Sequence, residues 1–409
     1  MSKNNENKLV PKLRFPEFQN EDDWRVDEVG NVFDVTRGYV LSMNLVSEEQ
    51  TESNPYPVYS SQTKNKGLAG YYKDFLYEDA ITWTTDGANA GDVNFRLGKF
   101  YCTNVCGVLV NSNGFANPCI AALINSVSRK HVSYVGNPKL MNGVMSKIKI
   151  PFPKIKEQQK IAACLSSLDE VITAESQKLG VLKDHKRGLL QNLLPVGKET
   201  IPKLRFKEFQ NADEWNEDTL ANIASFRRGS FPQPYGLPKW YDDENGMPFI
   251  QVFDVGEDFR LKPTTKRKIS SLAAEQSVFI PKGTLIITIQ GSIGRVAITQ
   301  YDAYIDRTLL LFEEFYQEVD ITFFAYTIFL LFEIEKQKAP GGIIKTITKE
   351  VLSSFVVKLP SIEEQQKIAS CLTSLDELIS AQTEKIESLQ LHKKGLLQGL
   401  FPNVNEVTE

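Results

Sequence analysis

Two long stretches of the chain carry apolar residues in steps that alternate between four and three positions. This spacing is the heptad pattern of helices that pair through one apolar face. The first stretch has Ile161, Leu165, Leu168, Ile172, Leu179, Leu182, Leu189 and Leu193. The second has Ile368, Leu372, Leu375, Ile379, Ile386, Leu389, Leu396 and Leu400. We therefore predict two long helices whose apolar positions form the seam of a helix pair.

Each predicted helix follows a proline and stops before another. The first spans residues 157–194 and would be about 57 Å long at about 1.5 Å per residue. Each seam has two polar positions, Glu175 and Lys186 in the first helix, Gln382 and Lys393 in the second. Polar seam residues can fix the register of a paired coil, and they also occur where a seam is simply hydrated. The sequence leaves both interpretations open.

The segments before these helices have the pattern of strands and loops. Residues 24–150 and 215–358 hold short β-type runs, such as 105–110 and 285–289, between Gly, Asn and Thr. One further helix is predicted over residues 318–336. The fold class is α+β, with two globular domains joined by two long helices in an antiparallel coiled coil and a pseudo-two-fold internal repeat. The predicted divisions are a first domain (1–150), a central helix (151–200), a second domain (201–358) and a C-terminal helix (359–409).

The chain contains the same frame twice. Residues 11–15 (PKLRF) return as 202–206, a shift of 191 positions, and residues 157–162 (EQQKIA) return as 364–369, a shift of 207. The chain between the two blocks is therefore 16 residues longer in the second copy, and it differs in sequence. A duplicated frame around two unlike inserts suggests one scaffold that presents two different binding domains.

Duplicated units tend to associate about a two-fold axis. If the two helices pair antiparallel, each domain precedes its own helix, so the domains are expected at opposite ends of the pair and in inverted orientation. Dimeric DNA-binding proteins have this arrangement, with half-sites about 34–36 Å apart. Because the two inserts differ in sequence, the two half-sites are expected to differ as well.

The composition is that of a soluble globular protein, with 42% hydrophobic and 24% charged residues among 409. No apolar run reaches the roughly 18 residues of a membrane span, and the N-terminus lacks the apolar core of a secretion signal. Five cysteines, an odd number, fit a reducing compartment. We therefore expect a cytoplasmic protein. Cys102, Cys106 and Cys119 lack the second close pair of a zinc site, and we expect no bound metal.

The formal net charge is −4, so a DNA-binding protein of this composition must place its positive charge locally or share phosphate contacts with a partner. Basic and amide side chains beside glycines suit phosphate contacts and base reading. The candidate DNA-contacting residues are Arg37, Gln62, Lys64, Lys66, Arg227, Arg228, Lys262, Lys266, Arg267, Lys268, Gln290 and Arg295. For each of them the alternative of a solvated loop position stays open.

A local likeness links the two inserts. Residues 84–93 (TTDGANAGDV) resemble residues 288–296 (TIQGSIGRV), with a strand before a glycine turn and a strand after it. The glycines are expected to supply tight backbone geometry. A Gly-x-x-Gly turn also occurs at phosphate sites, but by itself it does not identify one.

The repeated blocks resemble the conserved regions of specificity (S) subunits of type I restriction-modification systems. In the first copy the likeness rests on residues 157–161 (EQQKI), Leu168-Asp169, 186–191 (KRGLLQ) and 193–195 (LLP). In the second copy it rests on residues 364–368, Leu375-Asp376, 393–398 (KKGLLQ) and 400–402 (LFP). Order, spacing and duplication agree over nearly the whole chain.

This resemblance implies two target recognition domains, each reading one half of a bipartite site in double-stranded DNA. It implies that the helices set the separation of the half-sites and dock two modification (M) subunits. Those subunits would carry S-adenosylmethionine and methylate adenine, and restriction (R) subunits would complete an endonuclease that uses ATP and Mg. The S subunit itself would hold no cofactor, contact no membrane and catalyse nothing.

Two other classes of protein are open from the residues alone. A coiled-coil adaptor that presents two protein- or sugar-binding domains would suit the acidic charge. A nuclease or methyltransferase is disfavoured, because no Walker phosphate loop is present and residues 54–56 (NPY) lack the second proline of the amino-methyltransferase motif. Salt-dependent, sequence-selective binding to duplex DNA would separate a DNA reader from an adaptor.

Overall fold

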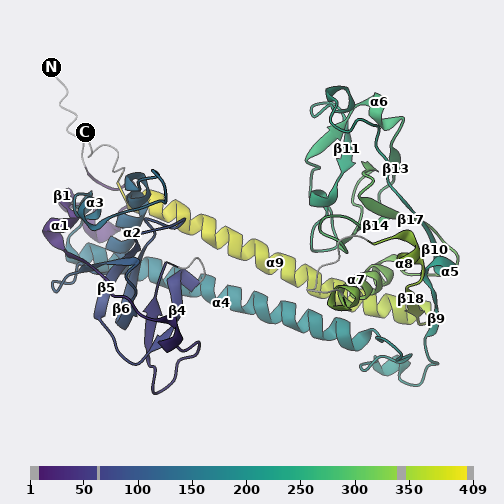
Figure 1. Ribbon diagram of the computed structural model, residues 1–409, viewed down its shortest axis with the longest axis horizontal. Coiled ribbons are helices and arrows are strands. Elements are labelled where there is room, and N and C mark those ends of the chain that lie inside the picture. The colour runs from purple at the N-terminus through teal and green to yellow at the C-terminus, as the bar shows by residue number, and fades with distance from the viewer. Residues whose placement is uncertain (1–8, 62–64, 339–346, 403–409) are drawn as a thin grey trace. The chain divides into compact units, whose positions relative to one another are not determined.

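The computed structural model describes residues 9–61, 65–338 and 347–402 (Figure 1). The chain divides into two compact units, of which the first combines residues 1–176 with 385–409 and the second is residues 177–384. Both units contain strands and helices, which confirms the α+β class. The predicted divisions at residues 150, 200 and 358 follow the sequence repeat. The compact units instead divide each long helix between them. The predicted divisions therefore stay an interpretation of the repeat.

The first unit is built on a six-stranded sheet in the order β2-β7-β5-β6-β3-β4. The pair β3 and β6 is parallel, and the other neighbours are antiparallel. Helix α2 (Pro118–Ser128) packs on this sheet, where Ile120 and Leu123 share a core with Ile81 and Trp83. The strands are β2 (Asp34–Arg37), β3 (Tyr56–Tyr59), β4 (Leu68–Tyr72), β5 (Tyr77–Thr84), β6 (Val93–Cys102) and β7 (Cys106–Val110).

The second unit repeats this topology with interruptions, as two four-stranded sheets in the orders β10-β17-β14-β15 and β12-β11-β16-β13. The parallel pair β11 and β16 matches β3 and β6. Strands β13 and β14 together take the place of β5, and β15 and β16 that of β6. The strands are β10 (Ala224–Arg228), β11 (Met247–Ile250), β12 (Arg267–Ile269), β13 (Val278–Ile280), β14 (Leu285–Thr288), β15 (Val296–Ile298), β16 (Ala303–Ile305) and β17 (Leu309–Phe315).

Helix α7 (Ile321–Lys338) stands in the second unit where α2 stands in the first. It begins three residues later than the predicted Glu318, because the side chain of Asp320 accepts a hydrogen bond from the amide of Phe323 at 2.8 Å and caps the helix there. Asn117 caps α2 in the same way, through the amide of Ile120.

Short elements complete both units. The two-stranded sheets are β1 (Arg25–Glu28) with β8 (Lys149–Phe152) and β9 (Asn216–Thr219) with β18 (Val356–Leu359). The short α-helices are α1 (Val29–Val32), α3 (Asn142–Ser146), α5 (Leu220–Ile223), α6 (Ser271–Ala274) and α8 (Lys349–Ser353). The 3-10 helices are η1 (Pro16–Phe18), η2 (Met43–Leu45), η3 (Asn65–Gly67), η4 (Arg129–His131), η5 (Lys207–Phe209), η6 (Pro238–Trp240) and η7 (Val252–Asp254).

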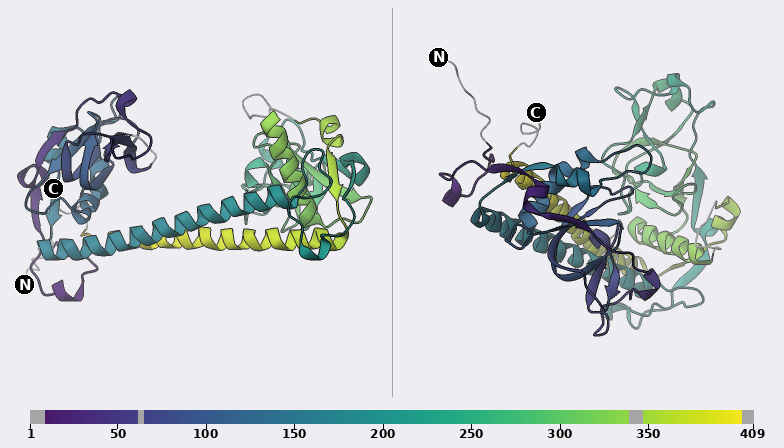
Figure 2. Two further views of the ribbon diagram at one scale, coloured as in Figure 1. Left: turned by 90° about the horizontal axis from the view of Figure 1, so that it is seen from below. Right: turned by 60° about the vertical axis from the view of Figure 1, so that its left-hand side comes forward.

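The two predicted long helices are α4 (Ile155–Leu193) and α9 (Ile362–Leu400), each 39 residues and continuous (Figure 2). Every predicted seam position is buried or half-buried, whereas apolar residues off the seam, such as Val181 and Leu391, are 68% and 70% exposed. The predicted seam is therefore confirmed. Over the described residues, no helix is both long enough and apolar enough to span a membrane.

The two helices pair antiparallel within each unit. In the first unit the start of α4, at Ile161 and Leu165, shares a core with the end of α9 at Leu400. In the second unit the end of α4 at Leu193 shares a core with the start of α9 at Ile368. Since opposite helix ends meet in both places, the antiparallel arrangement is confirmed.

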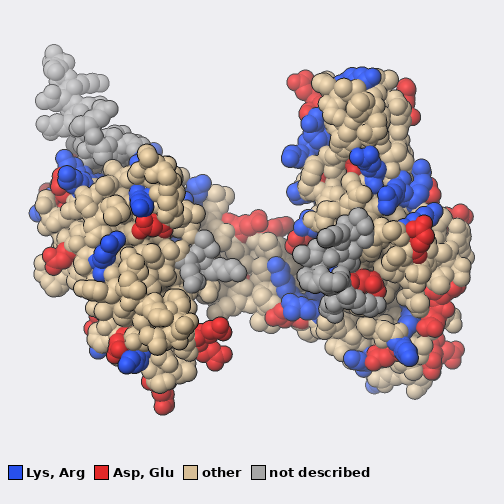
Figure 3. Space-filling model, viewed as in Figure 1, with Lys and Arg blue, Asp and Glu red and all other residues tan. Residues whose placement is uncertain are grey.

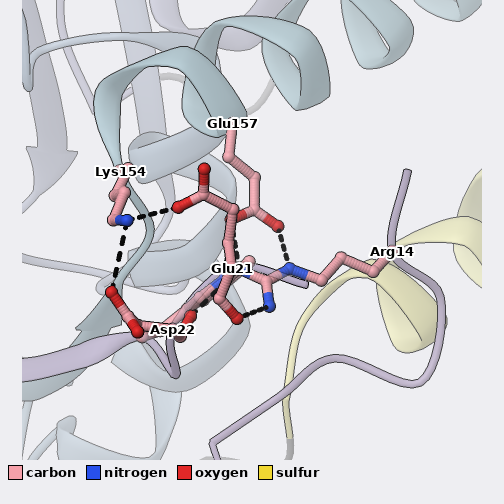
Figure 4. Close-up of polar contacts among 6 residues, drawn as sticks. Arg14, Glu21, Asp22, Lys154 and Glu157 are labelled. Atoms are coloured by element: carbon pink, nitrogen blue, oxygen red, sulfur yellow. Dashed lines mark hydrogen bonds and ion pairs between the residues drawn. The ribbon is translucent and has the colours of Figure 1, made fainter. Parts of the chain in front are cut away.

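The repeated sequence blocks contact each other. Arg14 of the first PKLRF block donates from Nε and Nη2 to the two oxygens of Glu157, each at 2.8 Å (Figure 4). Trp24 also donates to Glu157, at 3.1 Å. The side chains of Arg14 and Glu157 are 5% and 2% exposed. Lys154 binds Glu21 and Asp22 nearby at the surface. A buried bidentate pair has strict geometry, which explains why these two blocks return together.

The second copy builds the same joint. Arg205 donates to the two oxygens of Glu364 at 2.9 and 2.7 Å, again with both side chains buried. The following glutamine also has the same role in each copy. Gln158 and Gln365 donate to the carbonyls of Pro153 and Pro360, at 2.8 and 3.0 Å.

Candidate nucleic-acid interface

Four connections converge at one edge of the sheet in the first unit. The amides of Gly38 and Tyr39, after β2, donate to the carbonyls of Cys106 and Cys102 at 2.9 and 3.2 Å. The amide of Thr85, after β5, donates to Val105 at 3.0 Å, and the amide of Thr103 donates to Tyr59 at 2.9 Å. We call this edge the first loop edge; it comprises residues 37–40, 60–67, 85–87 and 103–105, of which 62–64 lie outside the described residues.

The second unit builds the same edge. The amides of Gly229 and Ser230 donate to Leu309 and Ile305 at 3.1 and 3.2 Å. The amide of Ile289 donates to Thr308 at 3.0 Å, and that of Asp306 to Ile250 at 3.0 Å. The second loop edge comprises residues 228–231, 251–268, 289–291 and 306–308. Each of the four bonds of the first edge thus has a counterpart in the second.

Glycines are required where the connections cross. A Cβ at Gly38 would lie 2.2 Å from the carbonyl oxygen of Cys102, and a Cβ at Gly229 would lie 2.3 Å from that of Ile305. In the glycine turns, Gly91 and Gly294 have φ of +89° and +83°, and their amides donate to Thr84 and Thr288 at 2.9 Å. The predicted likeness of the two turns and their tight geometry is confirmed; a role in phosphate binding stays a prediction.

The side chains on the two edges differ although the backbone is shared. The first edge exposes Tyr39, at 64%, and Asn104. The second has Ser230 and the exposed Arg307 at the corresponding places. Arg307 lies with its guanidinium 5.6 Å from the ring centre of Tyr235, and nothing in its local sequence singled it out.

Of the candidates in the first unit, Arg37 and Lys66 are exposed on the first loop edge, whereas Gln62 and Lys64 lie outside the described residues. The hairpin carrying Lys66 is held by Arg96, which donates to the Lys66 carbonyl at 2.7 Å and lies 3.7 Å from the Tyr59 ring centre. Burial lowers the pKa of the Arg96 guanidinium. Arg96 was missed because its role depends on a contact 30 residues away along the chain.

In the second unit Arg228 and Gln290 lie at the second loop edge. The β11–β12 connection corresponds to the hairpin of Lys66 in the first unit. It carries Lys262 and Lys266, and the strand that follows it, β12, begins with Arg267 and Lys268. The ammonium of Lys266 is 4.9 Å from the Phe253 ring centre, and that of Lys268 donates to the Glu244 carbonyl at 2.9 Å.

Three of the candidate arginines already pair with acidic side chains. Arg227 pairs with Glu313 at 2.5 Å, Arg267 with Asp243 at 3.2 Å, and Arg295 with Glu257 at 2.9 Å. Each would have to exchange a carboxylate for a phosphate or a base to contact DNA. On the face of each unit that Figure 3 shows, basic and acidic side chains are interspersed, without one large basic field.

Lys349 is a further cation that the sequence did not indicate. Together with Arg227 and Arg228 it lines a shallow cavity of about 90 Å³. Its ammonium lies 5.8 Å from the ring centre of Phe226, on the strand that leads to Arg228. The sequence did not indicate that Lys349 lies near Arg228, because the two residues are more than a hundred positions apart along the chain.

Cys102, Cys106 and Cys119 are buried, the first two in the sheet and the third in α2. Burial raises the pKa of Cys106 to about 11 and raises those of Cys102 and Cys119 as well. Within the described part of the chain, no cluster of three or more His, Cys, Asp or Glu side chains could hold a metal ion.

Comparison with known proteins gives consistent results. The family model for the type I restriction modification DNA specificity domain matches residues 21–184 and again residues 213–391. The type I restriction enzyme MjaVIII specificity subunit of Methanocaldococcus jannaschii is 24% identical, over 95% of this chain and 93% of its own length. A Mycoplasma pneumoniae protein named as the N-terminus of a type I specificity subunit is 39% identical over 143 residues, 34% of this chain and 75% of that protein.

Solved structures show the same fold. The S subunit of a type I restriction-modification system from M. genitalium aligns with a TM-score of 0.65 at 17% identity, over 97% of this chain and 100% of that one. A chain from a study of complex assembly and conformational transition in a type I system aligns with a TM-score of 0.57 at 16% identity, over 93% and 98%. Because the family model matches both copies of the repeat, the chain belongs to the type I restriction-modification DNA specificity family, the family of S subunits.

Proposed function

We propose that the chain reads a bipartite DNA site, with the first loop edge contacting one half and the second loop edge contacting the other. The observation that carries this proposal is the reuse of one backbone arrangement under unlike side chains. Four matching backbone hydrogen bonds build both edges, yet Tyr39 and Asn104 occupy the places of Ser230 and Arg307. A shared backbone arrangement that carries different side chains allows one scaffold to read two different DNA sequences.

Side chains on both edges have the chemistry for base reading. Arginine binds the O6 and N7 edge of guanine, and glutamine or asparagine binds the N6 and N7 edge of adenine. Arg228, Arg307 and Gln290 offer these groups on the second edge, and Arg37 and Asn104 on the first. Lys262 and Lys266 would contact phosphates, and such contacts position the protein without reading sequence.

The phosphate contacts are proposed to be shared with partner subunits. The net charge of −4 and the three acid-paired arginines leave this chain with little free positive charge for DNA. We therefore propose that two M subunits make many of the contacts with DNA phosphates and hold S-adenosylmethionine. R subunits would add the endonuclease activity that uses ATP and Mg. This chain would act in the cytoplasm as a non-catalytic subunit without a cofactor of its own.

The helix pair is proposed to set the separation of the half-sites and to dock the M subunits. Val171 on α4 and Leu378 on α9, separated by the repeat shift of 207, are apolar yet 42% and 55% exposed. Exposed apolar side chains at matching positions fit two equivalent protein contacts.

Selection from a random duplex library tests the proposal, using the chain together with its adenine-methyltransferase partner. We expect enrichment of two unlike half-sites separated by a gap of fixed length and unspecified sequence. Recovery of no enriched sequence, with binding to a protein or sugar ligand instead, would support the adaptor class.

A further inference from the structure

A polar cluster joins three elements inside the second unit. Lys186 of α4 pairs with Asp376 of α9, and the hydroxyl of Tyr326 on α7 donates to the other Asp376 oxygen at 2.5 Å. The Lys186 ammonium also lies 4.8 Å from the ring centre of Phe259 and 5.2 Å from that of Tyr326. One carboxylate therefore connects both long helices to the helix that packs on the sheet.

The cluster extends to the β11–β12 connection through Phe259. Its ring centre lies 4.6 Å from that of Tyr326 and 5.3 Å from that of Phe329. Phe259 has φ of +61°, a left-handed conformation that a bulky residue adopts only when its surroundings hold it. The aromatic contacts with α7, together with a hydrogen bond from the Ile298 amide to the Phe259 carbonyl at 3.1 Å, hold it in this conformation. The cluster thus contributes to holding the connection that carries Lys262 and Lys266.

Open space borders this cluster. Phe259 and Asp376 line two cavities, of about 340 Å³ and about 700 Å³. The connection is attached on its strand side by hydrogen bonds from the Ile298 amide to the Phe259 carbonyl, at 3.1 Å, and from the Tyr301 hydroxyl to the Lys262 carbonyl, at 3.0 Å. The cluster attaches it to the helices.

In the described residues of the first unit, the ion pair has a counterpart but the Tyr326 hydroxyl does not. Lys393 and Asp169, at the matching places in the repeat, pair at 2.5 Å, but their side chains are 28% and 39% exposed, against 13% and 17% for Lys186 and Asp376. Counted from the helix caps Asn117 and Asp320, the position of Tyr326 corresponds to Leu123, a core residue without a hydroxyl. The hairpin of the first unit is held by Arg96 instead.

We propose that Lys186, Asp376, Tyr326 and Phe259 form a latch that fixes the second DNA-reading edge on the helix pair. Tyr326 and Asp376 are positioning residues in this account and do not touch DNA. The latch sets where the basic β11–β12 connection stands relative to α4 and α9, and so contributes to the separation of half-sites that the complex accepts. That last step rests on the proposed function, whereas the latch itself does not.

Amide hydrogen exchange on the full chain tests the latch directly. In Tyr326→Phe, which keeps the ring and removes one hydrogen bond to a charged group, exchange across residues 256–262 should rise about tenfold. Asp376→Ala should raise it at least as much. Asp169→Ala, the matched change in the first unit, should leave residues 256–262 unchanged. Equal exchange in Tyr326→Phe and the wild type would overturn the latch.

Binding to a DNA series tests the consequence, with the partner methyltransferase present and the gap between half-sites varied by one base pair in each direction. The wild-type complex should prefer one gap, and Tyr326→Phe should reduce that preference severalfold without changing the bases selected in the halves. A preference that Tyr326→Phe leaves intact would overturn the positioning role. Absence of any sequence selectivity in the wild type would instead refute the proposed function, and the exchange result would still decide the latch.

Discussion

Charged residues that look alike in the sequence differ in what they do for stability. Arg14 and Lys154 both bind carboxylates where the N-terminal segment meets α4 (Figure 4), but the Arg14 pair is buried and Lys154 is 60% exposed. Removing one partner of a buried pair leaves an uncompensated charge away from water, whereas an exposed pair is largely replaced by solvent.

Arg14→Met is therefore expected to destabilise the first unit by about 3 kcal/mol, because Glu157 would remain buried with only Trp24 as donor. The change is measured by unfolding the chain with denaturant while amide hydrogen exchange is followed in the sheet of the first unit. The control is Lys154→Met, which should alter stability little. Comparable losses in both variants would contradict the assignment of the joint to the buried pair.

The cysteines offer a second test at this scale. The thiolate is the reactive form, and a pKa of about 11 leaves about one Cys106 thiol in a thousand ionised at pH 8. In the folded chain Cys102, Cys106 and Cys119 should resist maleimide, while the half-buried Cys164 and Cys371 react first. Peptide mass spectrometry identifies the labelled sites, and labelling of Cys106 should accelerate as pH rises toward 11. Early labelling of Cys106 at pH 8 would contradict its burial.

Residues inside the repeated blocks could be anticipated from the sequence, and those that act across the fold could not. Arg14 and Glu157 lie in blocks that both return in the second copy, and the repeat singled out these blocks, although not the contact between them. Arg96 and Arg307 have neither a repeat partner nor a local motif, and their places depend on how distant strands pair. The polar seam residues Lys186 and Lys393 pair with aspartates of the opposite helix, which favours the register interpretation over a merely hydrated seam.

Elements built from local periodicity were predicted well, and elements built from long-range pairing were not. The predicted bounds of the first long helix, residues 157–194, lie within two residues of α4 at each end, because heptads are local. The order of the six-stranded sheet could not be derived from the sequence. Strand β3 pairs with β6, although β4 and β5 lie between them along the chain. Where β13 and β14 replace one strand, a local pattern of short apolar runs does not reveal that they continue each other.

The crossing glycines allow a test at the scale of elements. Gly38→Ala would place a Cβ 2.2 and 2.3 Å from the carbonyls of Cys102 and Thr103, so the connection after β2 must shift, at a cost of about 1–3 kcal/mol. Selectivity for the bases of one half-site should fall, with the other half retained.

Gly180→Ala is the matched control, because Gly180 lies in α4 with open space around its Cβ position. It should stabilise the helix by about 0.5–1 kcal/mol and leave base selection unchanged. Thermal unfolding and library selection measure the two effects. Unaltered selection by Gly38→Ala would show that the first loop edge does not read DNA.

For the whole molecule, shared phosphate contacts predict weak DNA binding by this chain alone and strong binding with its methyltransferase partner. The logarithm of affinity should fall with the logarithm of salt concentration more steeply for the complex, since that slope counts the phosphates neutralised. Fluorescence anisotropy over a salt series measures both slopes. Equal affinity and equal slope with and without the partner would refute the sharing of contacts.

The most direct test of the central claim, that each loop edge reads one half of a bipartite site, is a map of methylated adenines in cells that carry edge variants of this chain. Arg228→Ala combined with Arg307→Ala should relax the bases accepted in one half and leave the other half and the gap unchanged. Arg37→Ala should do the same to the opposite half. Relaxation of both halves by either variant, or of neither half by both, would contradict the account.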